Sequence, residues 1–432
     1  MQEFQMLAKT YKGLEDVLAE ELVELGANNV QKERRAVSFT GDKSMLYKSN
    51  LCLRTATRIL VPIVQFKAKD ADAVYQACKQ IDWSKYMNLQ TGFSIDSTVY
   101  SEEFRHSKYV TYRVKDAIAD WWMEREGKRP SVRLTDPDLY LNVHIAGTDI
   151  IISLDSTGES LHKRGYRVAN TEAPINEVLA AGILLMAGWK GDTDFYDPMC
   201  GSGTILIEAA LIAQNIAPGV FRKEFAFERW NDFDTNLWEE IYNDDSRERA
   251  FTHHIYGSDA SYYAVQVALK NIKSAGQSRF VDVRQIRIEE IRREQPSDNG
   301  RALVITNPPY GNRLAQDKDI LRLYQDLGTA LKHQFTGATA WIISSNEEAL
   351  KCIGLKPNKK VHLLNGELDC LFNCYELFQG ERKEFVKTRK DQSQKHRPAE
   401  NQLRAEKSMS KHSHGRGFGT RQDDRGSVRS RR

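Results

Sequence analysis

The sequence predicts an α/β protein with a doubly wound, mostly parallel sheet in its C-terminal half, preceded by smaller α+β modules. Two observations predict this class. Between residues 175 and 386, strand-like and helix-like segments alternate, which is typical of a parallel sheet covered by helices on both faces. Before residue 156, strand-like segments accompany two amphipathic helices, which indicates separate α+β units.

Residues 1–59 predict the first small α+β module. The segment 13–26, GLEDVLAEELVELG, places leucines and a valine on one helical face and ends in Gly26, a favourable helix C-cap. Residues 37–39 and 59–66 have the β-branched, apolar composition of strands.

Residues 60–156 predict a second α+β module. SIDSTVY at 94–100 alternates like a strand, and residues 109–125 form an amphipathic helix that buries two tryptophans. A hairpin over 138–155 turns at AGTD. Residues 157–174 are polar and basic, and we expect a linker there.

Basic side chains in and after this second module are candidates for RNA contact. Arg105, Lys108 and Arg113 surround the start of the predicted helix, although an ordinary solvated helix end explains them equally well. Lys163 and Arg164 in the predicted linker are further candidates.

Residues 175–386 contain the alternating elements of the predicted parallel sheet. The expected helices cover 176–189, 204–214, 262–273 and 321–335. The expected strands cover 194–199, 254–260, 280–286, 302–307 and 338–346, and a hairpin closes the domain at 361–378. Ligands bind such sheets at the carboxyl ends of the strands, so functional motifs should lie there.

Length and composition limit the class of protein. A chain of 432 residues is too long for one ordinary hydrophobic core, so we expect two or three domains. No apolar run approaches the roughly 18 residues that a membrane span needs. The N-terminal MQEFQMLAKT lacks the apolar stretch of a signal peptide. We therefore expect a soluble, cytoplasmic protein with no membrane partner.

The cysteines indicate neither a disulfide scaffold nor a metal site. Six are scattered along the chain, which is too few for a disulfide-rich fold. In LDCLFNCYELF, Cys370 and Cys374 alternate with Phe372 on one face of a predicted strand. We interpret both as core thiols rather than as a metal pair, and we expect no metal.

Residues 387–432 form a basic tail. They contain 14 Lys or Arg and five Asp or Glu and so carry +9, whereas the first 386 residues carry −6. The tail has few large apolar residues, which predicts disorder. Its RGFG and RSRR sequences suit a polyanion, especially RNA. A solubilising extension without a partner is the alternative.

The motif DPMCGSGT at 197–204 joins a predicted strand to a predicted helix. Its glycines alone could serve a tight turn, but an acid, Asp259, ends the next strand and suits ribose hydroxyl groups. The P-loop lysine and the GxGxxG spacing are both absent, which favours a nucleoside-bearing cofactor without a pyrophosphate, with S-adenosylmethionine (SAM) as the candidate. The predicted cofactor-binding residues are Asp197, Pro198, Cys200, Gly201, Gly203, Thr204, Asp259, Ala260 and Asn307.

The motif Asn307-Pro308-Pro309-Tyr310 follows the apolar strand ALVIT and is the predicted catalytic site. The lone pair of an exocyclic amine on a base is delocalised, so the amine is a poor nucleophile. The Asn307 side-chain oxygen and the Pro308 carbonyl can accept its two N–H groups and aim the lone pair at a methyl donor. The prolines fix the loop, and Tyr310 can stack on a flipped-out or single-stranded base. A strand-ending turn with an ordinary surface tyrosine is the alternative.

The chain resembles the amino-methylating class I methyltransferases that contain a THUMP domain, in particular the RlmL-type 23S rRNA guanine-N2 methyltransferases. The resemblance covers roughly residues 1–386. It rests on DPMCGSGTILIEAA, NPPYGNRL, LLNGELDC, LHKRGYR and IAPGVFRKEFAFERWNDFD.

This resemblance implies a ferredoxin-like module at 1–59, a THUMP domain at 60–156 and a Rossmann-like class I methyltransferase domain at 175–386. It also implies SAM as the cofactor, guanine N2 as the target, and 23S rRNA or a pre-ribosomal particle as the partner. One place departs from the pattern. After the third strand, where many methyltransferases carry an acid that reads adenine, this sequence has Arg287, with Glu289 and Glu290 close by.

Three other functions remain open from the sequence. A tRNA guanine-N2 methyltransferase would have the same architecture. A DNA adenine-N6 methyltransferase would share NPPY, but usually needs a domain that reads duplex bases, and none is visible here. An RNA-binding assembly factor with an inactive catalytic fold is disfavoured by the intact Gly201, Asp259 and Asn307.

Overall fold

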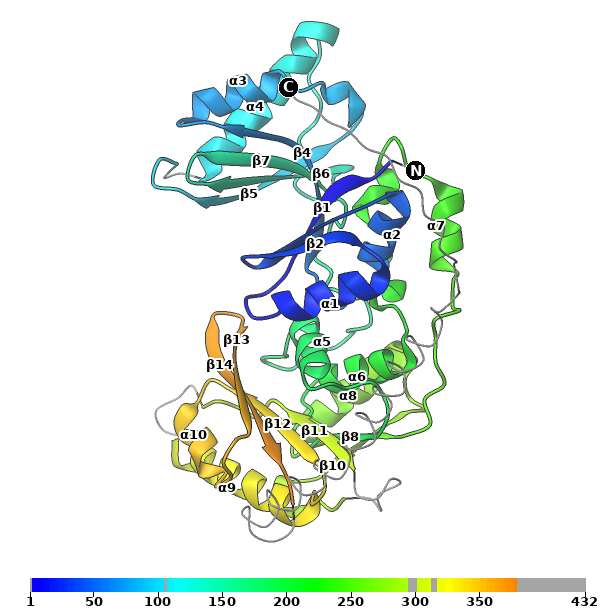
Figure 1. The fold of residues 1–432 in the computed structure, drawn as a ribbon, viewed down its shortest axis with the longest axis vertical. Helices are drawn as coiled ribbons and strands as arrows, with labels where there is room; N and C mark the ends of the chain where they lie inside the picture. The colour runs from blue at the N-terminus through cyan, green and yellow to red at the C-terminus, as the bar shows by residue number, and fades with distance from the viewer. Residues whose placement is uncertain (1, 105–106, 294–300, 312–316, 379–432) are drawn as a thin grey trace, which may run out of the picture. The chain divides into compact units, whose positions relative to one another are not determined.

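The computed structural model of the protein describes residues 2–104, 107–293, 301–311 and 317–378 (Figure 1). Residues up to Leu377 form one compact unit. The predicted basic tail and Arg105 lie outside the described residues. Among those that are described, no helix is long and apolar enough to cross a lipid bilayer.

The N-terminal part is built on one seven-stranded sheet with strand order β2-β3-β1-β4-β7-β6-β5. Neighbouring strands are antiparallel except β5 and β6, which are parallel. The strands are β1 (Phe4–Lys9), β2 (Asn28–Glu33), β3 (Ala36–Gly41), β4 (Arg58–Lys67), β5 (Phe93–Tyr100), β6 (Leu139–Ala146) and β7 (Asp149–Asp155). The helices that cover it are α1 (Glu15–Leu25), α2 (Lys43–Cys52), α3 (Ala71–Lys79) and α4 (Ser107–Glu126).

Strand β4 joins the two expected N-terminal modules into this single sheet. It pairs with β1 near its start, at Leu60 opposite Leu7, and with β7 along most of its length. The expected boundary between residues 59 and 60 therefore falls inside a continuous strand. Separate hydrophobic cores nevertheless lie along the sheet, one around Phe39 and Leu46 and the other around Trp83 and Val143.

The C-terminal part is a second seven-stranded sheet with strand order β10-β9-β8-β11-β12-β14-β13. Its strands β10, β9, β8, β11 and β12 run parallel, and β14 is antiparallel to β12. The strands are β8 (Asp194–Asp197), β9 (Ile255–Asp259), β10 (Val281–Gln285), β11 (Ala302–Thr306), β12 (Thr339–Ser344), β13 (Lys359–Asn365) and β14 (Leu368–Glu376). This confirms the doubly wound fold predicted from the alternating elements.

Helices cover both faces of this second sheet (Figure 1). On one face lie α5 (Glu177–Met186), α6 (Thr204–Gln214) and α8 (Tyr262–Ser274), and on the other α9 (Asp317–Gln334) and α10 (Glu347–Cys352). Successive residues of a strand point to opposite faces, so Ile305 packs in the first core and Val304 in the second. Cys370, Phe372 and Cys374 are all buried in the first core, which confirms the prediction of core thiols.

The segment after α6 fastens the catalytic domain to the N-terminal sheet. Phe227 stacks on Tyr47 of α2 with ring centroids 4.5 Å apart, and Trp238 of α7 (Thr235–Tyr242) packs edge-on against Tyr47. At a second contact, a Cβ at Gly182 of α5 would lie 2.6 Å from Leu14, so glycine permits this close approach. Both contacts are apolar and buried, which fixes the two sheets within one unit.

Candidate active site at the carboxyl ends of strands β8, β9 and β11

The glycine-rich loop lies between the end of β8 at Asp197 and the start of α6 at Thr204. Gly201 and Gly203 both adopt positive φ, +53° and +79°, which L residues with side chains rarely do. A Cβ at Gly203 would lie 3.2 Å from Ala268 of α8, whereas a Cβ at Gly201 would meet nothing within 4 Å. Gly203 therefore serves close packing, whereas Gly201 leaves open space beside the loop.

Asp259 ties this loop to the neighbouring strand. Its Oδ2 accepts a hydrogen bond from the Gly201 amide at 3.0 Å, and its Oδ1 accepts one from the Ser261 amide at 2.9 Å. Cys200 donates its amide to the Ser258 carbonyl at 2.9 Å. The two segments that the sequence assigned to the cofactor are thus held together, with Ala260 exposed beside them.

Asp197 lies beneath the loop rather than on its surface. Its side chain is 1% exposed, and Oδ1 accepts hydrogen bonds from the Thr306 hydroxyl at 2.8 Å and the Met199 amide at 3.2 Å. Burial raises the pKa of this carboxyl to about 7, although both hydrogen bonds oppose the shift. Asp197 therefore links the ends of β8 and β11 and brings the two predicted motifs together.

Asn307 and Tyr310 sit at the end of β11, next to that link. The Tyr310 hydroxyl donates to Asn307 Oδ1 at 2.5 Å and accepts from the Asn365 side-chain amide at 3.1 Å. Asn346 Nδ2 donates to the Tyr310 carbonyl at 3.0 Å. The Tyr310 ring is partly buried against the core, so in this conformation its hydroxyl orients Asn307. The prediction that Tyr310 stacks on a target base stays untested.

The third strand ends at Gln285, whose side-chain amide donates to the Ala260 carbonyl at 3.2 Å. Arg287 follows and pairs with Glu289 at 3.0 Å. The sequence pattern draws attention to Arg287 and its neighbours and not to Gln285. A glutamine after an alternating strand gives no signal by itself, because only the fold places it beside Ala260.

The predicted RNA contacts have different surroundings in the structure. Lys108 is exposed, and so is Lys163, which pairs with Glu159 at 2.8 Å. Arg113 pairs with Asp72 at 2.6 Å and stacks over Tyr75.

The prediction that Arg164 faces RNA is wrong. Its side chain is 2% exposed, and its guanidinium is enclosed between Glu208 of α6 and the backbone carbonyls of Arg54 and Leu161. The expected linker around it, residues 157–174, contains no helix or strand, and three of its side chains, Leu161, Arg164 and Tyr166, are buried in the interior. The polar and basic composition of this segment predicts exposure to solvent. Arg164 is buried instead because it pairs with the carboxylate of Glu208, which is far away in the sequence.

Arg167 and Asn271 also reach the glycine-rich loop, Glu177 supports Arg167, and sequence reasoning missed all three. Arg167 donates to the hydroxyls of Ser202 and Thr204, and Asn271 donates to the Ser202 carbonyl. Glu177 holds Arg167 from the start of α5. In the described parts of the chain, no group of three or more His, Cys, Asp or Glu side chains is arranged to hold a metal ion.

Comparisons with known proteins agree with this geometry. The sequence profile of an RMKL-like methyltransferase domain matches residues 164–373, that of an RlmL ferredoxin-like domain matches 5–60, and that of a THUMP domain matches 68–155. The matches confirm the predicted order of the three modules.

Two relatives and one solved structure illustrate the similarity. A putative RNA methyltransferase of Synechocystis sp. is 39% identical over 86% of this chain and 96% of its own length. The ribosomal RNA large subunit methyltransferase K/L of Photobacterium profundum is 36% identical over 87% of this chain but only 53% of its own, so the chain spans about half of that relative. The crystal structure of a putative methyltransferase complexed with S-adenosylhomocysteine (SAH) matches with a TM-score of 0.79 and 30% identity, over 88% of this chain and 100% of the other.

Proposed function

We infer the function of this chain from its family: it belongs to the RMKL-like methyltransferases, with a ferredoxin-like module and a THUMP domain before the catalytic domain. It is a SAM-dependent RNA methyltransferase. We propose that it methylates the exocyclic N2 amine of a guanine in 23S rRNA. The observation that carries this proposal is the juxtaposition of Asn307 with the glycine-rich loop, through the hydrogen bond from Thr306 to Asp197.

The glycine-rich loop fits a nucleoside cofactor. Open space lies above Gly201, and the Asp259 carboxylate stands at the adjoining strand end, where a ribose would need an acceptor for its hydroxyl groups. We assign the cofactor to Gly201, Gly203, Thr204, Asp259 and Ala260. SAM, when bound, supplies an electrophilic methyl group. Asp197 contributes by fixing the loop from below.

Asn307 holds the target amine. Its Oδ1 has two lone pairs, and Tyr310 uses one of them. The second can accept an N–H of the amine, while the Pro308 carbonyl accepts the other N–H. The two acceptors orient the nitrogen lone pair towards the methyl donor, and such positioning can contribute several kcal/mol to the rate.

No side chain has to act as a general base in this proposal. The methylated nitrogen is strongly acidic before it loses its proton, so water can accept that proton. The carboxyl of Asp197, which hydrogen-bonds to the residue before Asn307, is buried and accepts hydrogen bonds from Thr306 and Met199. Its position suits a structural tie and not proton transfer.

The test identifies the methylated nucleoside. The purified full chain is incubated with labelled SAM and unmodified total RNA, and the digested RNA is fractionated. Label in N2-methylguanosine from large-subunit rRNA is the expected result. The same nucleoside from tRNA would move the substrate to tRNA. Label in N6-methyladenosine, or only in added DNA, would refute the assignment of the pocket to guanine.

A further inference from the structure

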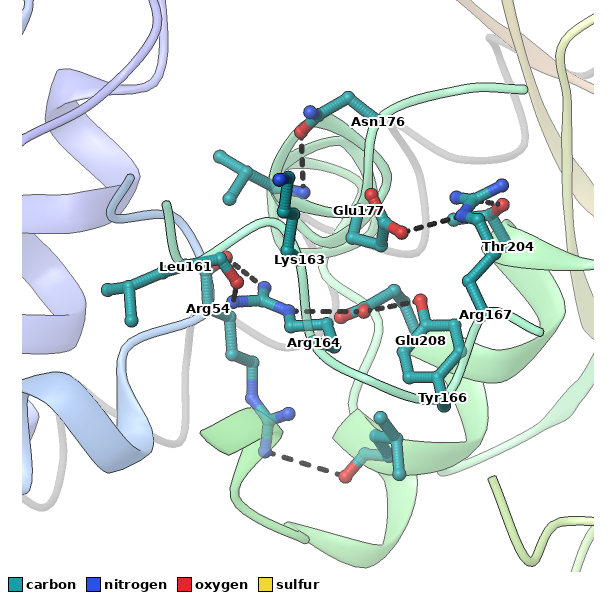
Figure 2. Close-up of polar contacts among 12 residues, drawn as sticks. Arg54, Leu161, Lys163, Arg164, Tyr166, Arg167, Asn176, Glu177, Thr204 and Glu208 are labelled. Atoms are coloured by element: carbon teal, nitrogen blue, oxygen red, sulfur yellow. Dashed lines mark hydrogen bonds and ion pairs between the residues drawn. The ribbon is translucent and has the colours of Figure 1, made fainter. Parts of the chain in front are cut away.

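A strap, defined here as residues 161–170, runs from the N-terminal sheet to the glycine-rich loop. At its start, the Leu161 amide donates to the Thr57 carbonyl at 2.8 Å. Arg164 then donates to the Arg54 carbonyl at 2.5 Å and to the Leu161 carbonyl at 2.8 Å, so this half is bound to the ferredoxin-like module. Figure 2 shows the contacts of Arg164 with Arg54 and Leu161 and its approach to Glu208.

The first half of the strap is also bound to α6. Arg164 Nε lies 3.5 Å from Glu208 Oε1, and the Tyr166 hydroxyl donates to the same oxygen at 2.9 Å. All three side chains are nearly or fully buried. Glu208 stands one helical turn after Thr204, which is the first residue of α6. The strap is therefore anchored on the same helix that begins with the glycine-rich loop.

The second half of the strap contacts the loop itself through Arg167. Its guanidinium donates to Ser202 Oγ at 3.1 Å and to Thr204 Oγ1 at 2.9 Å, the two hydroxyls that flank Gly203. Glu177 Oε1 accepts from Arg167 Nε at 2.7 Å and holds the group in place (Figure 2). The Arg167 side chain is 14% exposed, so water competes little for these bonds.

Asn271 of α8 reinforces this arrangement. Its Oδ1 accepts the amides of Val168 and Ala169, both at 2.9 Å. Its Nδ2 donates to the Ser202 carbonyl at 3.1 Å. Arg167 therefore joins the strap to the loop directly, and Asn271 joins them by hydrogen bonds to both.

We propose that Arg167 is a positioning residue for the methyl donor, acting through Ser202 and Thr204 on the glycine-rich loop. This inference rests on the proposed placement of the cofactor on that loop. The loop turns at two glycines with positive φ, and glycine leaves the backbone many alternative conformations. One planar guanidinium bonds the hydroxyls on both sides of Gly203 and so selects a single conformation. A lysine ammonium lacks this fixed fork of donors.

The strap offers a matched control in Arg222. Its guanidinium donates to the carbonyls of Ser160 at 3.1 Å, Lys163 at 2.9 Å and Glu159 at 2.8 Å. Arg222 therefore holds the strap at Lys163 and the two residues just before the strap, and its recorded contacts do not include the glycine-rich loop. Arg222→Ala removes these contacts and leaves the contacts of Arg167 in place. A loss caused only by a loosened strap would appear equally in Arg222→Ala and in Arg167→Ala.

The experiment measures binding of SAH to the full chain by calorimetry, with RNA affinity measured separately. We expect Arg167→Ala to weaken SAH binding at least tenfold, Arg167→Lys to weaken it about fivefold, and Arg222→Ala to change it less than twofold. RNA affinity should stay within threefold in every variant. Added methylguanidine should restore part of the SAH affinity of Arg167→Ala, because it replaces the missing fork.

Two results would overturn the inference: SAH affinity of Arg167→Ala within twofold of the wild type, or an equal loss in Arg222→Ala. If Arg167→Ala does not fold, Ser202→Ala takes its place, since it removes one acceptor of Arg167. An unchanged SAH affinity there would also count against the inference. Failure of the wild-type chain to bind SAH would instead refute the proposed placement of the cofactor, which separates the two outcomes.

Discussion

Tyr310→Phe separates two roles for the tyrosine of the NPPY motif. The substitution keeps the aromatic ring and removes only the hydroxyl. That hydroxyl donates to Asn307 Oδ1 at 2.5 Å and accepts from Asn365 at 3.1 Å. If the hydroxyl orients Asn307 for the target amine, its loss must slow the methyl transfer. If the ring only stacks on the base, its loss should have little effect.

The expected magnitude follows from the bonds that are lost. A typical hydrogen bond contributes about 0.5–1.5 kcal/mol net, and a buried group left without a partner costs about 1–3 kcal/mol. Part of that cost destabilises the ground state and the transition state equally and does not change the rate. We therefore expect the activation free energy of methyl transfer to rise by about 1.5 kcal/mol. About 1.4 kcal/mol corresponds to a tenfold change. Tyr310→Phe should therefore lower kcat about tenfold and leave the KM for RNA within twofold.

The assay is steady-state methylation at varied concentrations of the RNA substrate with saturating SAM, which yields kcat and the KM for RNA. Tyr375→Phe is the control, since it removes the buried hydroxyl that accepts a hydrogen bond from Asn373 within strand β14. Wild-type kcat in Tyr310→Phe, together with a large loss in Tyr310→Ala, would contradict the orienting role and leave stacking as the explanation.

Three further predictions concern charge. Asp197 has a pKa of about 7 in the folded chain against about 4 when unfolded, so its protonated form favours folding and that stability is lost as pH rises from about 4 to about 7. The free energy of unfolding of Asp197→Asn, measured by thermal unfolding, should therefore rise relative to that of the wild type between pH 5 and pH 8, by at most about 4 kcal/mol. Parallel pH profiles would refute the shift. Arg164→Met should destabilise the chain by about 3–5 kcal/mol, because Glu208 is left buried without its cation, and the added Glu208→Gln should recover part of the loss in thermal unfolding. Deleting residues 387–432 should weaken RNA binding and flatten its salt dependence, whereas identical salt slopes would exclude the tail from RNA contact.

The sequence predicted the parts of the fold in which local pattern and tertiary position agree. The parallel strands and the helices between them have clear periods, and both motifs stand where strands end. Helix α2 was missed because it is buried on most of its faces, including the polar Ser49 and Asn50, so no amphipathic stripe shows. Strand β2 was missed because its sequence NNVQKE is largely exposed and does not alternate.

The motifs of the site could be predicted from the sequence, but the side chains that hold the glycine-rich loop in place could not. Gly201, Asp259 and Asn307 belong to recognisable patterns at strand ends, and the structure brings these strand ends together. Arg167 and Asn271 act on the loop from 35 or more residues away, across contacts that only the folded chain creates. A basic segment before a catalytic domain is typical of a linker. Only the structure shows that Arg164 in this segment pairs with the buried Glu208.

In the proposed mechanism, Asn307 holds the target amine beside a cofactor on the glycine-rich loop. The most direct test compares Asn307→Ala with the wild type in RNA methylation and in SAH binding. Methylation should fall to background while the SAH dissociation constant stays within twofold, because the Asn307 side chain serves the amine and not the fold of the loop. Retained methylation, or a loss of SAH affinity that accounts for the loss of turnover, would contradict it.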